Sequence, residues 1–162
     1  MKIGVISDTH ISGSADEIPS QIYDHFSGVD LILHAGDLLE LRVLRELERI
    51  AKAKGVYGNM DLPEVRKSLP FKEIINAGKF KIGLTHGFGP PIGLRRRVKK
   101  VFRGDEVDVI VFGHSHSPLN LVEKGTLFFN PGSPTDRIFA PYRSCGILEV
   151  GSEVKGRIIR LK

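Results

Sequence analysis

The chain has 162 residues, of which 41% are hydrophobic and 27% are charged, a composition typical of a single compact domain covering residues 1–162. It contains no run of about 18 apolar residues, which argues against a membrane-spanning helix. The single cysteine, Cys145, excludes an internal disulfide and favours a reducing, cytoplasmic setting. A formal net charge of +5 suits an anionic partner, although it serves solubility equally well.

The first half of the chain alternates apolar strands with amphipathic helices. The pattern predicts strands over residues 2–7 and 31–37, each ending in polar residues. Apolar residues recur at the helical period over 16–27 and 39–53, which predicts a helix after each strand. Residues 55–61 are expected to form a short strand that runs into a turn.

The second half is richer in strands. Residues 71–87 predict a hairpin that turns at 76–78, and the basic segment 94–103 carries an apolar stripe typical of a helix. Another strand is expected over 107–116, and the last third predicts a β meander. Alternating strands and helices followed by consecutive strands indicate an α/β sandwich with helices on its outer faces.

Side chains that can bind metal ions follow the predicted strands. Two pairs are spaced two residues apart, so in an extended segment the members of each pair would point to the same side. Sites in open α/β sheets gather at the carboxyl ends of strands, so we expect these loops to converge. The full set comprises Asp8, His10, Asp37, Asn59, His86, His114 and His116.

The chemistry of this set indicates the kind of ion. It combines imidazole, carboxylate and amide groups without a thiolate, which suits divalent transition metals. The set exceeds the needs of one tetrahedral ion and suits two ions that lie roughly 3.5–4 Å apart and share a carboxylate. Asp37 stands alone at its strand end and is the natural bridge. We therefore expect two divalent ions per chain, with manganese first and nickel, cobalt, iron or zinc as alternatives.

The order of these motifs resembles the signature of the calcineurin-like metallophosphoesterases. The chain is most similar to the small single-domain phosphodiesterase branch of bacteria and archaea. The resemblance implies a four-layer αββα sandwich of two mixed β-sheets flanked by helices. It is carried by Asp8-Thr9-His10, Gly36-Asp37, Gly58-Asn59, Thr85-His86-Gly87, Gly113-His114-Ser115-His116 and Asn130-Pro131-Gly132-Ser133.

The resemblance also implies how the ligands are divided. One ion would be held by Asp8, His10, Asp37 and His116, and the other by Asp37, Asn59, His86 and His114. The implied activity is hydrolysis of a small phosphoester, foremost a phosphodiester, by direct attack of a hydroxide that bridges the two ions. Asp37 and Asn59 would take part in catalysis, and Asn59 and Asp61 would contact the substrate.

One position departs from the wider family. Many members have a histidine directly after the asparagine, where it is thought to help the leaving group depart. Here that position is Met60, which has no proton to give. We therefore expect activity to favour esters with good leaving groups, or a water molecule to act as the proton donor.

Other functions remain open from the sequence. The same fold can serve as a non-catalytic protein-interaction scaffold, as in a relative in the retromer coat, or as a phosphomonoesterase. Nucleic acid is a less favoured partner, because the basic run fits the solvated face of a helix. A homo-oligomer is as compatible with the sequence as a monomer, since no interface is readable. The basic run consists of Arg95, Arg96, Arg97, Lys99, Lys100 and Arg103.

Overall fold

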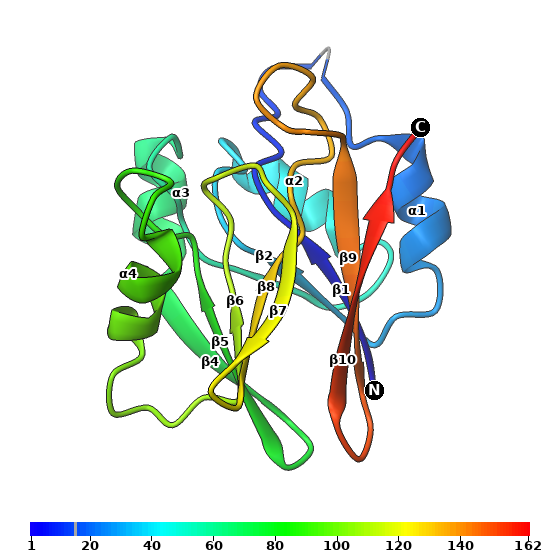
Figure 1. Ribbon diagram of the computed structural model, residues 1–162. Coiled ribbons are helices and arrows are strands. Elements are labelled where there is room, and N and C mark those ends of the chain that lie inside the picture. The colour runs from blue at the N-terminus through cyan, green and yellow to red at the C-terminus, as the bar shows by residue number, and fades with distance from the viewer. Residues whose placement is uncertain (15) are drawn as a thin grey trace.

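The computed structural model describes residues 1–14 and 16–162, and it consists of two five-stranded β-sheets packed face to face (Figure 1). The first sheet has the order β10-β9-β1-β2-β3 and the second has the order β4-β5-β6-β8-β7. The first contains β1 (Lys2–Ile6), β2 (Leu31–His34), β3 (Ala53–Gly55), β9 (Ser144–Val150) and β10 (Val154–Arg160). The second contains β4 (Lys72–Ala77), β5 (Phe80–Thr85), β6 (Val109–Val111), β7 (Leu119–Glu123) and β8 (Thr126–Asn130).

Both sheets are mixed. In the first, β1, β2 and β3 are parallel, and β9 runs antiparallel to β1 and β10. In the second, β5, β6 and β8 are parallel, and β4 and β7 are antiparallel edge strands. In each sheet, the carboxyl ends of the parallel strands lie at the same edge. The loops that follow these strands carry the predicted ligands.

Helices cover the outer face of each sheet. Buried side chains of α1 (Ser20–Phe26), α2 (Leu41–Leu47) and α3 (Pro63–Ser68) pack in one cluster with outward-facing residues of the first sheet. The stripe on α4 (Leu94–Val101) packs in a separate cluster on the second sheet. Figure 1 shows α1 and α4 on opposite sides of the molecule. The four-layer αββα sandwich expected from the sequence is therefore confirmed.

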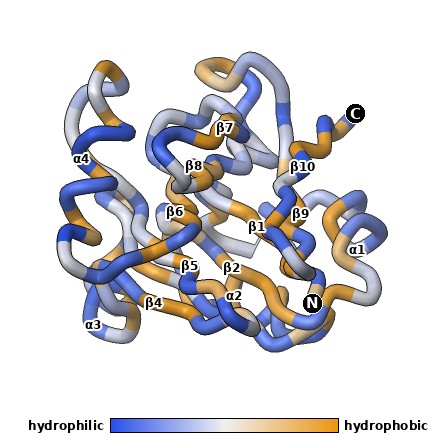
Figure 2. Tube along the Cα trace, turned by 60° about the horizontal axis from the view of Figure 1, so that its bottom comes forward, coloured by the Kyte–Doolittle hydropathy of each residue, from blue (hydrophilic) through white to orange (hydrophobic). Residues whose placement is uncertain are grey.

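The central strands are buried on both faces. Ile3 and Val5 of β1 point into the cluster between the sheets, whereas Ile6 belongs to the cluster beneath the helices. Alternate residues of a strand face opposite sides, so a strand covered on both sides must be apolar throughout. In Figure 2, the strands in the middle of the molecule are coloured mainly as hydrophobic, whereas hydrophobic and hydrophilic residues alternate along α4.

A phenylalanine links the two sheets across the core. Phe129 of β8 is completely buried and lies against Gly146 of β9 and Gly156 of β10. A Cβ atom on Gly146 would approach the Phe129 ring to 2.5 Å, and one on Gly156 would approach it to 2.7 Å. The absence of side chains at these two strand positions makes room for the ring and sets how closely the sheets approach.

Several predicted elements differ from the structure. The helix expected over 39–53 ends at Leu47, because Ala53 already pairs with Ile32 as the first residue of β3. The short helix α3 was not predicted, since its six residues are too few to show a helical period. Within the described residues, no helix is long and apolar enough to cross a membrane.

The predicted terminal meander was wrong in its topology. The hairpin β7–β8 belongs to the second sheet, where β8 pairs in parallel with β6. The hairpin β9–β10 belongs to the first sheet, where β9 pairs with β1. Between the hairpins, residues 131–143 carry the chain from one sheet to the other. Strand patterns alone do not distinguish these pairings, because both hairpins have similar lengths and apolar faces.

We expect Gly146→Ala to destabilise the fold by about 1–3 kcal/mol, because the new methyl group would overlap the buried Phe129 ring. The free energy of unfolding in urea measures this effect. Gly151→Ala is the matched control, since no atom lies within 4 Å of the position that its new methyl group would take. Equal stability of the two variants would contradict the proposed contact between the sheets.

Candidate metal centre

All seven predicted ligands meet at one edge of the sandwich. Asp8 follows β1, Asp37 follows β2, and the Asn59 loop follows β3 in the first sheet. His86 follows β5 and His114 and His116 follow β6 in the second sheet. The carboxyl ends of parallel strands from both sheets therefore face a common space, as expected for α/β sites.

The first group of ligands surrounds Asp8. The Asp8 Oδ1 atom lies 3.3 Å from His116 Nε2 and 3.9 Å from His10 Nε2. The two Nε2 atoms of His10 and His116 are 3.3 Å apart. Asp8 is fully buried, while both rings are partly accessible. These three residues offer donor atoms within 4.8 Å of one another, a spacing that one ion can bridge.

The second group surrounds His86. Its Nε2 atom lies 3.2 Å from Asp37 Oδ2, 3.9 Å from Asp8 Oδ1 and 3.2 Å from Asn59 Oδ1. The Asn59 Oδ1 atom is also 2.9 Å from His114 Nδ1, which connects His114 to the group. Asp8, Asp37 and His86 again place donor atoms within 4.8 Å of one another.

Asp37 lies between the two groups. Its Oδ2 atom is 3.7 Å from His10 Nε2 and 3.2 Å from His86 Nε2, so one oxygen faces a ring of each group. Its Oδ1 atom accepts a hydrogen bond of 2.7 Å from the Met60 backbone N–H. The oxygen that accepts no backbone hydrogen bond, Oδ2, is thus the one aimed at both groups. This position suits a carboxylate shared by two ions.

The donor chemistry fits two divalent transition metals. Nitrogen and oxygen donors are present without sulfur. The Nδ1 atom of His86 faces the Ala35 carbonyl oxygen at 2.7 Å, and the Nε2 atom of His114 faces that of Gly89 at 2.7 Å. When each ring donates there, its other nitrogen turns a lone pair toward the Asn59 oxygen. Such facing lone pairs need a proton or a cation between them.

The electrostatics of the site agree with a need for positive charge. Burial opposes the charged form of His86, but the hydrogen bond to Asp37 and the charge of Asp8 outweigh it and raise its pKa to about 9. The hydrogen bond to Asp8 raises the pKa of His116 to about 9, against the effect of burial. Two buried carboxylates close together therefore draw protons onto the surrounding rings. Bound cations would supply the same charge.

The ligand loops have an unusual backbone. Sequence reasoning placed each Asp-x-His or His-x-His pair in an extended segment, and this was wrong. The φ angle is positive for several ligands, in the left-handed region that non-glycine residues rarely adopt. The values are 53° for Asp8, 46° for His10, 56° for Asp37, 69° for His114 and 54° for His116. Each such residue costs roughly 1–3 kcal/mol, which surrounding contacts must offset.

Hydrogen bonds between the loops hold this conformation. The backbone N–H groups of Asp8 and His10 donate to the carbonyl oxygens of Gly36 and Asp37, each at 3.0 Å. Ser133 Oγ donates to the Asp8 carbonyl at 2.7 Å from a loop far along the chain. The two βα loops and the segment after β8 are therefore locked together around the ligands.

Two glycines allow the loops to come this close. A Cβ atom on Gly113 would overlap Ser7 Oγ and lie 2.5 Å from Asp8 Oδ2. A Cβ atom on Gly58 would overlap the Asp37 carboxylate. The glycines that precede Asn59 and His114 in the motifs are therefore required by close packing against the buried carboxylates.

Asp61 lies beneath the ligands. It is buried, and its oxygens accept backbone N–H bonds from Gly58 at 2.6 Å, Leu39 at 2.6 Å and Asp37 at 3.0 Å. These bonds tie the Asp37 loop to the Asn59 loop. Contact of Asp61 with a substrate, as expected from the sequence, stays a prediction.

Two supporting residues escaped sequence reasoning. Arg66 of α3 donates through Nε to the Asp61 carbonyl at 2.9 Å and through Nη2 to the Asn59 carbonyl. Asp136 accepts a hydrogen bond from His116 Nδ1, and backbone N–H groups of Ile138 and Phe139 donate to its other oxygen. The only signal for Asp136 was its place three residues after the Asn-Pro-Gly-Ser motif.

His34 is fully buried but is not among the grouped ligands. Its Nε2 atom lies 3.1 Å from Thr9 Oγ1, and its Nδ1 atom accepts the Gly36 N–H at 3.2 Å. Burial lowers its pKa to about 3, so the ring is neutral and can accept that bond.

The family model described as the calcineurin-like phosphoesterase superfamily domain matches residues 1–153. The chain belongs to this superfamily. A probable metallophosphoesterase of Methanocaldococcus jannaschii is 39% identical over 163 residues, which cover 100% of this chain and 82% of that protein. A protein of the same organism named as a phosphodiesterase is 28% identical over 149 residues, covering 82% of this chain and 83% of that protein.

Solved structures show the same calcineurin-like architecture. Vps29 of Entamoeba histolytica, determined in complex with zinc, superposes with a TM-score of 0.77 and 26% identity over 99% of both chains. The resemblance predicted from the motifs is therefore confirmed at the level of superfamily and fold. Within this calcineurin-like fold, five residues form a cluster suited to two metal ions: Asp8, His10, Asp37, His86 and His116.

We expect Asp136→Asn to weaken metal binding by about 10- to 100-fold, because it removes the charged acceptor that orients His116. Titration of metal-stripped protein against a chelating indicator measures the affinity. Asp105→Asn is the control, since that carboxylate pairs with Lys72 on the surface. If both variants bind metal as tightly as the unmodified protein, Asp136 does not position His116.

Proposed function

We propose that the chain is a metal-dependent phosphodiesterase that hydrolyses a small phosphoester. The observation that carries this proposal is the position of Asp37 Oδ2, which faces one histidine of each ligand group. The ions, manganese foremost, would be held by Asp8, His10, Asp37, Asn59, His86, His114 and His116. Asp37 would bridge them, with His116 in the first set and His114 in the second.

When bound, two such ions would supply a hydroxide nucleophile near neutral pH and positive charge for the phosphate oxygens. The protein's own residues would orient the substrate. Asn59 is exposed, and its oxygen is directed at His86 and His114, which leaves its NH₂ group available to donate to a phosphate oxygen. No nucleophilic side chain is required for direct hydrolysis.

A pocket beside the first ligand group can receive the rest of the substrate. It has a volume of about 610 Å³, and its lining includes His10 and His116 together with Ile138 and Phe139. These two apolar side chains are 83% and 79% exposed. Such exposure of large apolar groups beside a polar site is typical of ligand recognition. The pocket therefore supports an ester group with apolar character.

The charges of this pocket favour a diester over a monoester. Asp16, Glu17 and Asp136 line it together with Arg137. A phosphomonoester is largely dianionic at neutral pH, whereas a diester carries one negative charge. The carboxylates of Asp16 and Glu17 repel a dianion more strongly than a monoanion, which supports a diester. The similarity to a protein named as a phosphodiesterase points the same way.

We expect metal-stripped protein resupplied with manganese to hydrolyse bis-p-nitrophenyl phosphate at least about tenfold faster than p-nitrophenyl phosphate, judged by kcat/KM. Nickel, cobalt, magnesium and zinc are tested in parallel, and release of nitrophenol is the measurement. A faster rate on the monoester would identify a phosphomonoesterase instead.

Asp37→Asn supplies the companion test of the shared carboxylate. The change keeps the shape of the side chain but removes the negative charge, so we expect kcat to fall by about a hundredfold or more. Asp105→Asn again serves as the control. Unchanged activity of Asp37→Asn would exclude the bridging role.

Met60 gives a further expectation for the proton of the leaving group. Its side chain is 57% exposed beside the ligands and cannot donate a proton. We expect rates to fall steeply as the leaving-group pKa rises, and Met60→His to flatten this dependence by supplying a general acid. Met60→Gln is the control of similar shape. A flat dependence in the unmodified protein would contradict this expectation.

The alternative function is a protein-interaction scaffold. The observation that favours it is the similarity to Vps29 structures, which cover the whole chain. Purified protein without bound metal and without turnover of any phosphoester would support the scaffold. Under either function, a cytoplasmic location remains a prediction, the oligomeric state remains open between monomer and homo-oligomer, and nucleic acid remains a less favoured partner.

A further inference from the structure

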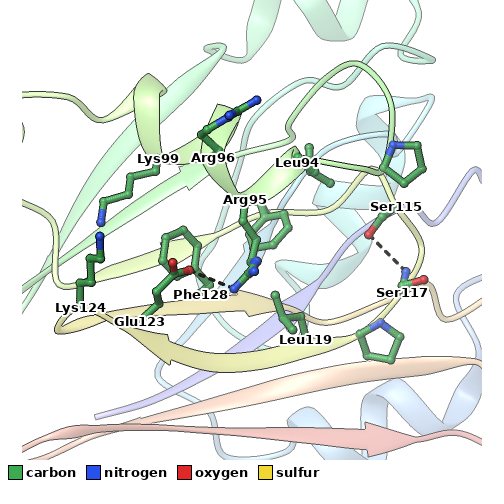
Figure 3. Close-up of a pocket in the computed structure, with 14 residues that line it drawn as sticks. Leu94, Arg95, Arg96, Lys99, Ser115, Ser117, Leu119, Glu123, Lys124 and Phe128 are labelled. Carbon is green, nitrogen blue, oxygen red and sulfur yellow. Dashed lines mark hydrogen bonds and ion pairs between the residues drawn. The ribbon is translucent and has the colours of Figure 1, made fainter.

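A second pocket of about 660 Å³ lies on the outer face of the second sheet, apart from the residues that form the two ligand groups (Figure 3). One wall is α4 and the other is the β7–β8 hairpin, with Lys99 and Lys124 on facing sides. Leu94 and Phe128 lie at its apolar floor. The volume falls within the range of sites for small organic ligands.

The way α4 packs creates this pocket. Leu94, Val98 and Phe102 form the apolar stripe that anchors the helix on Phe112 and Phe128. Consecutive helical residues point about 100° apart, so Arg95 and Lys99, which are four residues apart, share one side of the helix. That side faces the β7–β8 hairpin, so Arg95 and Lys99 are turned toward a hollow rather than only toward solvent.

The basic residues of α4 do not share one role. Arg97 donates to the backbone carbonyl oxygens of Phe88 at 2.7 Å and Ile92 at 3.0 Å, and so it holds the loop before the helix. Arg95 pairs with Glu123 at 2.9 Å. Among the described residues, Lys99 and Lys124 have no carboxylate within ion-pair distance. Figure 3 shows their side chains pointing toward one another from the two walls.

The pocket therefore carries excess positive charge. Its lining includes Arg95, Arg96, Lys99 and Lys124 but only one acid, Glu123, within the part of the chain that the structure describes. Two ammonium groups that converge repel each other, and an anion between them would relieve the repulsion. The positive charge of this pocket is therefore suited to bind a phosphate group.

The position of Lys124 adds a second observation. It lies in the two-residue β7–β8 turn with a φ of 49°, followed by Gly125 with a φ of 79°. Turns of this shape favour asparagine, aspartate or glycine at the first position, because other side chains are strained there. A lysine is strained at this position, yet it places an ammonium group above the pocket. Backbone strain of this kind is concentrated at functional positions.

We propose that this pocket binds a phosphorylated small molecule, with the phosphate between Lys99 and Lys124 and an apolar part against Leu94 and Leu119. The opposite end of the pocket is formed by Ser115 and Ser117, whose hydroxyl groups can accept or donate hydrogen bonds. The pocket is distinct from the site of hydrolysis, although Ser115 lies between two of the proposed metal ligands. Binding here does not depend on the proposed phosphodiesterase activity.

Residue-resolved titration tests the proposal. Zinc-loaded ¹⁵N-labelled protein is titrated with adenosine monophosphate and, separately, with inorganic phosphate, and amide shifts are followed by NMR. We expect saturable shifts at Lys124, Gly125 and Leu119 with adenosine monophosphate. Any binding at the metal centre is reported separately by the amides of Asn59 and Gly87, which allows the two sites to be distinguished.

The variant Lys99→Gln/Lys124→Gln should weaken the pocket's affinity by about tenfold or more, because two charge-assisted contacts are lost. The control variant Lys79→Gln/Lys81→Gln removes the same charge from the distant β4–β5 hairpin and should leave the affinity of the pocket unchanged. Equal affinity of the first variant and the unmodified protein would overturn the site, as would shifts confined to the metal centre. Equal affinity for inorganic phosphate would overturn the role of the apolar floor.

Discussion

Burial of two carboxylates at one point is the constraint on which the rest of the site depends. Asp8 and Asp37 are almost inaccessible to solvent, and Asp8 Oδ1 and Asp37 Oδ2 both face His86. Like charges in a poorly solvated environment repel and lose hydration, so they require compensating cations. The surrounding histidines provide part of this charge through protonation. Divalent ions would provide it more completely, which explains why so many nitrogen and oxygen donors converge.

The fold meets this requirement by combining the ends of two sheets. Neither sheet alone supplies the site, since Asp8 and Asp37 come from the first and His86 and His116 from the second. The packing of Phe129 against Gly146 and Gly156 is one of the contacts that hold the two sheets together, and the ligand loops extend from the ends of these sheets. The packing between the sheets therefore contributes both to the stability of the core and to the geometry of the site.

The sequence predicted what depends on periodicity and residue chemistry. The apolar strands and the convergence of Asp8, Asp37 and His86 followed from strand ends and ligand types. It could not predict the left-handed backbone at Asp8 or His116, because that conformation is imposed by contacts between loops distant in sequence. For the same reason, the division of the last four strands between two sheets was not readable from their alternating patterns. Asp136 was missed because its importance arises only from its contact with His116.

The basic run shows how one sequence pattern can separate into different physical roles. Periodicity correctly predicted that Leu94 and Val98 pack inward, and it suggested a solvated surface for the basic residues. In the structure, Arg97 holds the loop that contacts His114 through Gly89, whereas Arg95 pairs with the β7–β8 hairpin. Lys99 faces another lysine across a pocket. Net charge alone does not distinguish these basic residues, because the role of each one depends on the groups that its side chain contacts. The absence of a matching acid beside Lys99 among the described residues is therefore more informative than the overall basicity of the chain.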